Sequence, residues 1–187
     1  NLGIGHTRWA THGGVTVANA HPHLDCTKKI AVLHNGIIEN YSEIKIELVK
    51  KGHTFISETD TEVASHLIEE LLKKNSFTDA VRFAFNRFHG LNAIVVFSAE
   101  TNELIAAKNG SPLIVGKGKD GLYIASDASG IIKHTKLVLF LRDNEMVHLG
   151  KDVRLFTLPK GKEIKPKFET ITWKFEEVTK GKYPHYM

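Results

Sequence analysis

The order of apolar and polar residues predicts strands in the first part of the chain. Leu2 and Ile4 alternate with glycines, as in a strand already under way. Residues 30–34 are mainly apolar, which suits a strand buried on both faces, and Asn35-Gly36 follows at once. Because Asn-Gly is the commonest two-residue hairpin turn, we expect the chain to turn there, unless these two residues also serve a site.

The helical spacing of apolar residues then predicts three helices. The first spans about residues 41–51 and stops before a glycine. The second begins in a capping box, in which the hydroxyl of Thr59 and the carboxylate of Glu62 would close the first turn. The third spans residues 76–88 and begins at a serine, a residue that caps helices well.

After residue 90 the pattern changes to short apolar runs separated by tight turns. The predicted strands are residues 91–98, 103–108, 112–116, 122–126, 137–141, 146–149 and 153–157. Such strands after consecutive helices favour antiparallel sheets with the helices on the outer faces. A doubly wound parallel fold would need a helix after nearly every strand, and only residues 127–134 offer even a short one. We therefore expect an α+β sandwich.

The composition is that of a globular domain without structural disulfides. The 187 residues are 42% hydrophobic, so we expect one domain over residues 1–180 and the start of a linker at 181–187. The one cysteine, Cys26, permits no intramolecular disulfide, which favours a reducing, cytoplasmic location. The opening residues have neither an initiator methionine nor a signal pattern, so we expect a fragment of a longer polypeptide.

The charge balance argues against a nucleic-acid partner, and the apolar runs argue against a membrane segment. Lys and Arg total 25 against 21 Asp and Glu, and glutamates interrupt the lysines after residue 160, as on a solvated face. The apolar runs are far shorter than the roughly 20 residues that span a bilayer.

Several residues before position 65 have side chains that suit a binding site. The planar guanidinium of Arg8 suits a carboxylate that Trp9 would cover, although a surface Arg beside a core Trp is the alternative. The Asn35 amide and the Gly36 N–H could donate two hydrogen bonds to an oxyanion. Asp60 either offsets the dipole of the following helix or accepts an ammonium group. Together these residues describe a pocket for an α-amino acid.

A zinc site is a weaker interpretation of the sequence. His21, His23 and Cys26 lie close in sequence, but a proline between the histidines in an extended segment would point their side chains to opposite sides. We therefore favour a polar loop, an ordinary thiol at Cys26, and a protein without metal or cofactor.

The chain resembles the class II glutamine amidotransferases, which have an N-terminal nucleophile. The matching motifs are HTRWATHG at 6–13, NAHPH at 19–23, HNGIIEN at 34–40, SETDTEV at 57–63, GSPL at 110–113, IASD at 124–127 and HYM at 185–187. The residues of the first motif, HTRWATHG, resemble those of the hexosamine-forming members of the family. In these members a downstream sugar isomerase domain uses the ammonia to aminate fructose 6-phosphate. The resemblance implies an αββα sandwich, L-glutamine as substrate and a possible homodimer of the intact enzyme.

The resemblance also implies roles for individual residues. Arg8 would bind the glutamine carboxylate and Asp60 its ammonium group, while Asn35 and Gly36 would form the oxyanion hole. The residues that would shape and close the pocket are Trp9, Thr11, His12 and Gly13.

The nucleophile of this family is a cysteine at the processed N-terminus, and Asn1 is not that residue. Cys26 lies between two matched motifs and does not align with it. We therefore expect the nucleophile in upstream residues that this chain lacks, and no activity from the chain alone. The alternative is a non-catalytic glutamine-sensing or assembly domain that has kept the pocket.

Overall fold

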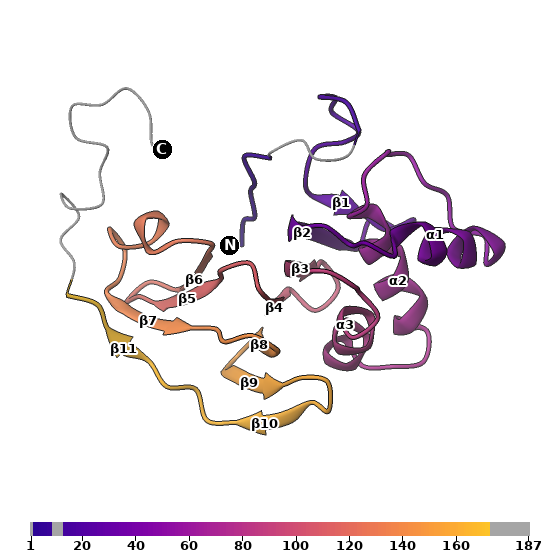
Figure 1. The fold of residues 1–187 in the computed structure, drawn as a ribbon. Coiled ribbons are helices and arrows are strands. Elements are labelled where there is room, and N and C mark those ends of the chain that lie inside the picture. Colours follow the sequence, from indigo (N-terminus) through magenta and orange to yellow (C-terminus); the bar gives the residue numbers. More distant parts are fainter. Residues whose placement is uncertain (1, 9–12, 173–187) are drawn as a thin grey trace. The chain divides into compact units, whose positions relative to one another are not determined.

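The computed structural model describes residues 2–8 and 13–172, and the chain forms two compact units (Figure 1). The first unit comprises Asn1–Ser111 and Arg142–Lys165, and the second comprises Pro112–Leu141 and Pro166–Met187. The single domain expected over 1–180 stays a prediction. The linker expected at 181–187 lies outside the described residues.

The first unit is built on a seven-stranded sheet. Its strands are β1 (His23–Leu24), β2 (Ile30–Gly36), β3 (Asn92–Ser98), β4 (Glu103–Asn109), β8 (Glu145–Leu149), β9 (Val153–Thr157) and β10 (Lys162–Ile164). They lie in the order β1-β2-β3-β4-β8-β9-β10, and every neighbouring pair is antiparallel. Short turns connect most neighbours in this order, so much of the sheet is a meander.

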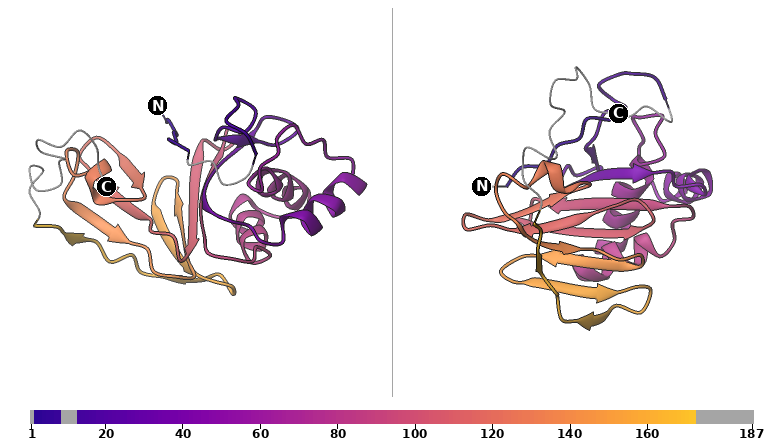
Figure 2. Two further views of the ribbon diagram at one scale, coloured as in Figure 1. Left: turned by 45° about the horizontal axis from the view of Figure 1, so that its top comes forward. Right: turned by 60° about the vertical axis from the view of Figure 1, so that its left-hand side comes forward.

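Three helices cover one face of this sheet (Figure 2). They are α1 (Tyr41–Lys50), α2 (Glu62–Leu72) and α3 (Phe77–Phe85). Their apolar stripes bury Leu48, Leu67 and Val81 against sheet residues such as Val32 and Ile94. Each such side chain contributes about 1.5–3 kcal/mol of transfer free energy, so this core fixes the helices on the sheet.

The second unit has its own sheet and core. Its strands are β5 (Ile114–Lys117), β6 (Leu122–Ala125), β7 (Leu137–Phe140) and β11 (Glu169–Thr170), in the antiparallel order β11-β7-β5-β6. A short 3₁₀ helix, η1 (Ala128–Gly130), directly precedes Ile131 and Ile132. These two side chains pack with Val138 and Ile171 in the core of the second unit.

Most of the predicted elements are confirmed. An α+β fold with two antiparallel sheets is present, and each strand expected after residue 90 is found within two residues of its predicted ends. The stacking of the two sheets as a sandwich stays a prediction. Residues 2–8 form no strand, contrary to expectation, because the sheet of the first unit ends at β1 and no strand pairs with them.

The two predicted helix caps have different outcomes. Ser76 caps α3, since its side chain accepts a hydrogen bond from the Asp79 N–H at 3.2 Å. The capping box at α2 is wrong, because α2 follows Thr61 and no side chain caps it. Glu62 instead accepts hydrogen bonds from the N–H groups of Ile56 and Ser57 at 2.9 and 2.7 Å, which fold the preceding loop onto the helix.

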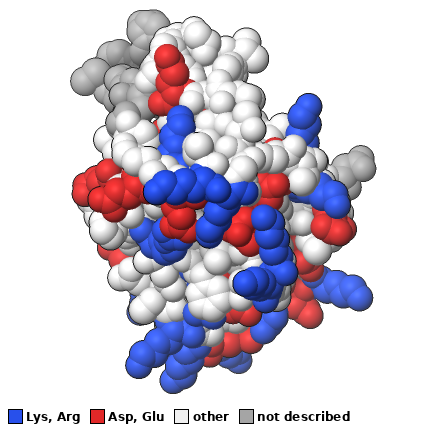
Figure 3. Space-filling view, turned by 90° about the vertical axis from the view of Figure 1, so that its right-hand side faces the viewer, with Lys and Arg blue, Asp and Glu red and all other residues white. Residues whose placement is uncertain are grey.

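Acidic and basic side chains are mixed on the helix-bearing side of the first unit (Figure 3). Many of them pair, for example Lys51 and Arg87 with Glu47. Within residues 2–8 and 13–172, no helix combines the length and the apolar character needed to cross a bilayer.

Candidate functional site

The candidate site lies at the C-terminal end of β2, where Asn35 and Gly36 are the last two residues of the strand. They pair with Ala93 and Asn92 of β3, so the expected hairpin turn at Asn-Gly is wrong. Gly36 has φ +121°, and a Cβ there would lie 2.0 Å from the Leu91 carbonyl oxygen. Glycine is therefore required, because any side chain would collide with the backbone of the segment before β3.

A hydrogen-bonded histidine orients the Asn35 amide. His6 Nε2 lies 2.8 Å from Asn35 Oδ1, and His6 Nδ1 accepts a hydrogen bond from the Arg8 N–H at 2.9 Å. Since Nδ1 is the acceptor, the proton of the neutral ring is on Nε2 and is donated to Asn35. The amide oxygen is thereby occupied, which leaves the Nδ2 group of Asn35 as the donor for a ligand.

Arg8 lies in the segment that follows His6. It is half-buried, has φ +49°, and donates from Nη1 to the Gly14 carbonyl at 3.0 Å and from Nη2 to the Gly13 carbonyl at 3.4 Å. The guanidinium thus joins Arg8 to the backbone of Gly13 and Gly14. The other expected pocket residues, Trp9, Thr11 and His12, lie outside the described residues.

Asn19 ties the loop of Gly13 and Gly14 to the segment that leads to Asp60. The Asn19 side chain is buried, donates to Glu58 Oε2 at 3.0 Å and accepts from the Glu58 N–H at 2.9 Å. The Gly14 N–H donates to the same carboxylate at 3.2 Å. The hydrogen bonds from Asn19 and Gly14 lower the pKa of Glu58. Two segments 39 residues apart are therefore held together beside the site.

Asp60 is buried, with 3% of its surface exposed. Its Oδ2 atom accepts a hydrogen bond from the Ile38 N–H at 2.8 Å, just beyond the end of β2. The carboxylate thus makes a tertiary bond, α2 has no side-chain cap, and the offset of the helix dipole by Asp60 stays a prediction. Its role toward an ammonium group stays a prediction.

His34, which the sequence reasoning did not single out, is held as a neutral ring beside Asp60. The Asn92 side chain donates from Nδ2 to the Gly90 carbonyl at 3.0 Å, so its Oδ1 accepts from His34 Nε2 at 2.8 Å. His34 Nδ1 then accepts from the Thr61 hydroxyl at 2.9 Å. Burial lowers the pKa of His34, in keeping with an uncharged ring. In the sequence, the position of His34 directly before Asn35 is the signal that could have identified it as a site residue.

His21 and His23 lie on the same side of the chain. Their rings are in edge contact with centroids 5.0 Å apart, and His21 also lies 4.4 Å from the His6 ring. The expectation that they point to opposite sides is wrong, because the chain bends at residues 20–22 and is not extended there. Burial, reinforced by His6, lowers the pKa of His21 to about 3. The His21 ring, which lies beside that of His6, is therefore uncharged at neutral pH.

Cys26 lies at the opposite end of β2 from Asn35. It is in the connection between β1 and β2, and its Sγ contacts His53 and His66 rather than His21 and His23. The residues from 30 to 35 of an extended strand span about 17 Å. Burial raises the pKa of the Cys26 thiol, so at neutral pH the thiol is protonated. Cys26 is therefore no nucleophile for the site at Asn35.

Comparisons with known proteins identify the family of the chain. Residues 6–133 match the family described as "Glutamine amidotransferase domain". The whole chain is 46% and 48% identical to enzymes named glutamine–fructose-6-phosphate aminotransferase (isomerizing) from Thermococcus kodakarensis and Pyrococcus horikoshii, and it covers 32% of each.

Solved structures give the same result. The glutamine phosphoribosylpyrophosphate amidotransferase of B. subtilis, complexed with ADP and GMP, matches with a TM-score of 0.69 and 25% identity over 81% of this chain and 34% of that chain. A structure described as the allosteric regulatory enzyme of purine biosynthesis matches with a TM-score of 0.67 and 27% identity, at the same coverage.

The fold is that of the amidotransferases with an N-terminal nucleophile. The chain belongs to the glutamine amidotransferase domain family. The chain matches the glutamine–fructose-6-phosphate aminotransferases over its whole length and spans only about a third of theirs.

Proposed function

We propose that this chain is the glutamine-hydrolysing part of an enzyme that transfers the amide nitrogen of L-glutamine to fructose 6-phosphate, giving glucosamine 6-phosphate. The identity of 46–48% to relatives of that name extends over the whole chain and supports this assignment. Those relatives are about three times as long, which supports a further, sugar-isomerising domain in the intact polypeptide.

The observation that carries the proposal is the orientation of Asn35 by His6 at 2.8 Å. With its oxygen accepting from His6, the Asn35 side chain turns its Nδ2 group outward as a donor, next to the backbone of Gly36. Two donors fixed before the reaction stabilise the oxyanion that forms when a nucleophile attacks the glutamine side-chain amide.

The roles of Arg8 and Asp60 are proposed from the family resemblance. Arg8 would take the α-carboxylate through its planar fork, and Asp60 would take the α-ammonium group. Attack by a cysteine thiolate releases ammonia and leaves a glutamyl thioester, which water hydrolyses. The nucleophile is proposed to lie outside these 187 residues, because Cys26 is at the far end of β2.

The test compares the chain with the intact polypeptide from which it comes. Only the intact polypeptide should release ammonia from L-glutamine. Ammonia release by the 187-residue chain that disappears in Cys26→Ala would contradict the proposal. Glutamine binding by the intact polypeptide without hydrolysis would instead favour a sensing domain.

Location and assembly are part of the same proposal. The single cysteine supports a reducing, cytoplasmic compartment. A homodimer of the intact enzyme is proposed from the family resemblance, and the mass of the intact protein in solution tests it.

A further inference from the structure

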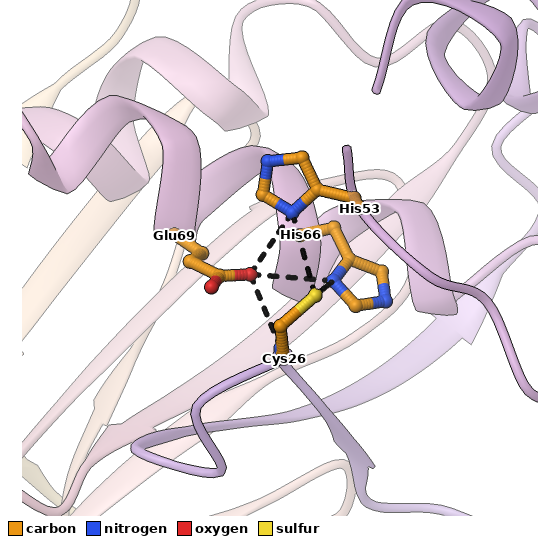
Figure 4. Close-up of side chains that lie close together, drawn as sticks. All are labelled: Cys26, His53, His66 and Glu69. Atoms are coloured by element: carbon orange, nitrogen blue, oxygen red, sulfur yellow. Dashed lines mark hydrogen bonds and ion pairs between the residues drawn. The ribbon is translucent and has the colours of Figure 1, made fainter. Parts of the chain in front are cut away.

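Four side chains with metal-binding atoms converge at the N-terminal end of β2 (Figure 4). Cys26 comes from the connection between β1 and β2, His53 follows α1, and His66 and Glu69 lie on α2. One ligand atom from each, Sγ, two Nδ1 atoms and a carboxylate oxygen, lies within 4.8 Å of all the others. Three separate segments of the first unit thus meet at this cluster.

Four of the six distances between these atoms are close to those of a tetrahedral zinc site. Cys26 Sγ lies 3.4 Å from His66 Nδ1 and 3.7 Å from His53 Nδ1. Glu69 Oε2 lies 3.0 Å from His53 Nδ1 and 3.3 Å from His66 Nδ1. Zinc bond lengths in tetrahedral geometry separate sulfur from nitrogen by about 3.6 Å and nitrogen from oxygen by about 3.4 Å. A zinc ion among them would bond sulfur at about 2.3 Å and nitrogen or oxygen at about 2.0–2.2 Å.

The outer nitrogen of each histidine also faces a carboxylate. His53 Nε2 lies 3.2 Å from Glu70 Oε2, and His66 Nε2 lies 3.5 Å from Glu62 Oε1. Each ring therefore lies between two carboxylates, Glu69 on its Nδ1 side and another on its Nε2 side. A neutral imidazole has one N–H and can donate to only one of them.

A cation bound to the Nδ1 atoms of both histidines removes the need for a second N–H on either ring. Each Nδ1 lone pair would then bind the metal, and each Nε2–H would donate to its outer carboxylate. Carboxylates that hold the outer N–H of a ligating histidine are the usual second layer of zinc sites.

The ligand types and the burial favour zinc over other common cations. Thiolate and imidazole ligands suit Zn²⁺, whereas Mg²⁺ and Ca²⁺ prefer sites made only of oxygen. The His53 and His66 side chains are at most 4% exposed, while Cys26 is exposed and gives access from solvent. Thiolate and the Glu69 carboxylate would together balance the charge of the ion.

We propose that Cys26, His53, His66 and Glu69 bind one Zn²⁺ ion in a structural site. Four protein ligands leave no open position for a substrate, which distinguishes structural from catalytic zinc. The ion would join the β1–β2 connection and the end of α1 to α2. It would stabilise the frame that positions Asn35 without taking part in glutamine hydrolysis.

The first test measures zinc binding by the 187-residue chain after removal of metal with a chelator. We expect one equivalent of zinc by elemental analysis, and a thiolate-to-cobalt charge-transfer band when Co²⁺ is added instead. Zinc should also raise the Tm of the chain, because binding to the folded state alone stabilises it. These three readouts need no variant, and failure to bind zinc would overturn the proposal.

Variants then test the ligands. Cys26→Ser should abolish the charge-transfer band, and Cys26→Ser and Glu69→Gln should each weaken zinc binding by more than about 100-fold, beyond the usual loss for outer partners. His89→Gln, an exposed histidine outside the cluster, is the matched control and should bind zinc normally. Unchanged zinc affinity in a folded Cys26→Ser chain, checked by circular dichroism, would overturn the assignment. Because this site lies apart from Asn35, its failure leaves the proposed glutaminase function untouched.

Discussion

His6 Nε2 lies 2.8 Å from the side-chain oxygen of Asn35, and the same ring accepts the backbone N–H of Arg8 through Nδ1. One imidazole therefore joins the proposed oxyanion donor to the segment of the proposed carboxylate binder. The two bonds fix the tautomer of His6 and the direction of the Asn35 amide. The proposed catalytic role of Asn35 and the proposed binding role of Arg8 can be tested separately.

Replacing Asn35 should affect kcat rather than KM. In the intact polypeptide, Asn35→Ala should lower kcat for glutamine hydrolysis by roughly 10²- to 10³-fold, the usual loss for one oxyanion donor. KM should change little, because the donor acts on charge that exists only in the transition state. Steady-state ammonia release measures both constants.

The variant Asn35→Asp is the matched control. It keeps an oxygen that can accept from His6, but it sets a carboxylate against a developing negative charge. Near-normal kcat in a folded Asn35→Asp enzyme would remove Asn35 from the oxyanion hole.

Replacing Arg8 should weaken glutamine binding. Arg8→Lys keeps the positive charge but loses the planar fork, so affinity should fall by about 1.5–3 kcal/mol, the range for a hydrogen bond to a charged group. Titration of the intact polypeptide with L-glutamine measures the change. If affinity is unchanged, the α-carboxylate is bound elsewhere.

Replacing Asp60 by Asn should weaken glutamine binding and leave the stability of the fold nearly unchanged. An amide oxygen in Asp60→Asn can still accept the bond from the Ile38 N–H, so Tm should change little. The lost charge should weaken glutamine binding by about 1.5–3 kcal/mol. A large drop in Tm with unchanged glutamine affinity would show a purely structural role for Asp60.

The buried ring of His21 should make stability depend on pH. Its pKa in the folded state is about 3, below the ordinary value of 6.5, so below pH 6.5 the unfolded chain binds a proton that the folded chain does not. Stability should therefore fall as the pH is lowered from 6.5 toward 3, by up to about 1.4 kcal/mol for each pH unit.

Denaturant unfolding of the wild type and His21→Gln at pH 7 and pH 5 measures this contribution. The loss of unfolding free energy between these pH values should be smaller in the variant by roughly 1–2 kcal/mol. His89→Gln, which changes an exposed histidine, should behave as the wild type. Equal losses in His21→Gln and the wild type would contradict the assignment.

The sequence by itself determined the elements that depend on neighbours along the chain. Helix α3 begins where Ser76 can bond an amide three residues later, and α1 ends before Gly52 at φ +94°. Most strands after residue 90 are joined by short turns, so alternation and turn residues were enough to place them. The motif residues also sufficed to indicate the amidotransferase family, which residues 6–133 confirm.

Only the tertiary structure decided how polar groups distant in sequence are paired. Asn35 and Gly36 extend β2 instead of forming a turn because β3, more than 50 residues later along the chain, supplies their partners. Glu62 does not close a capping box because its carboxylate accepts hydrogen bonds from the N–H groups of Ile56 and Ser57 in the preceding loop. Cys26 meets His66, 40 residues away, rather than its sequence neighbour His23. A buried polar group must find a partner wherever the folded chain places one, and local spacing does not contain that information.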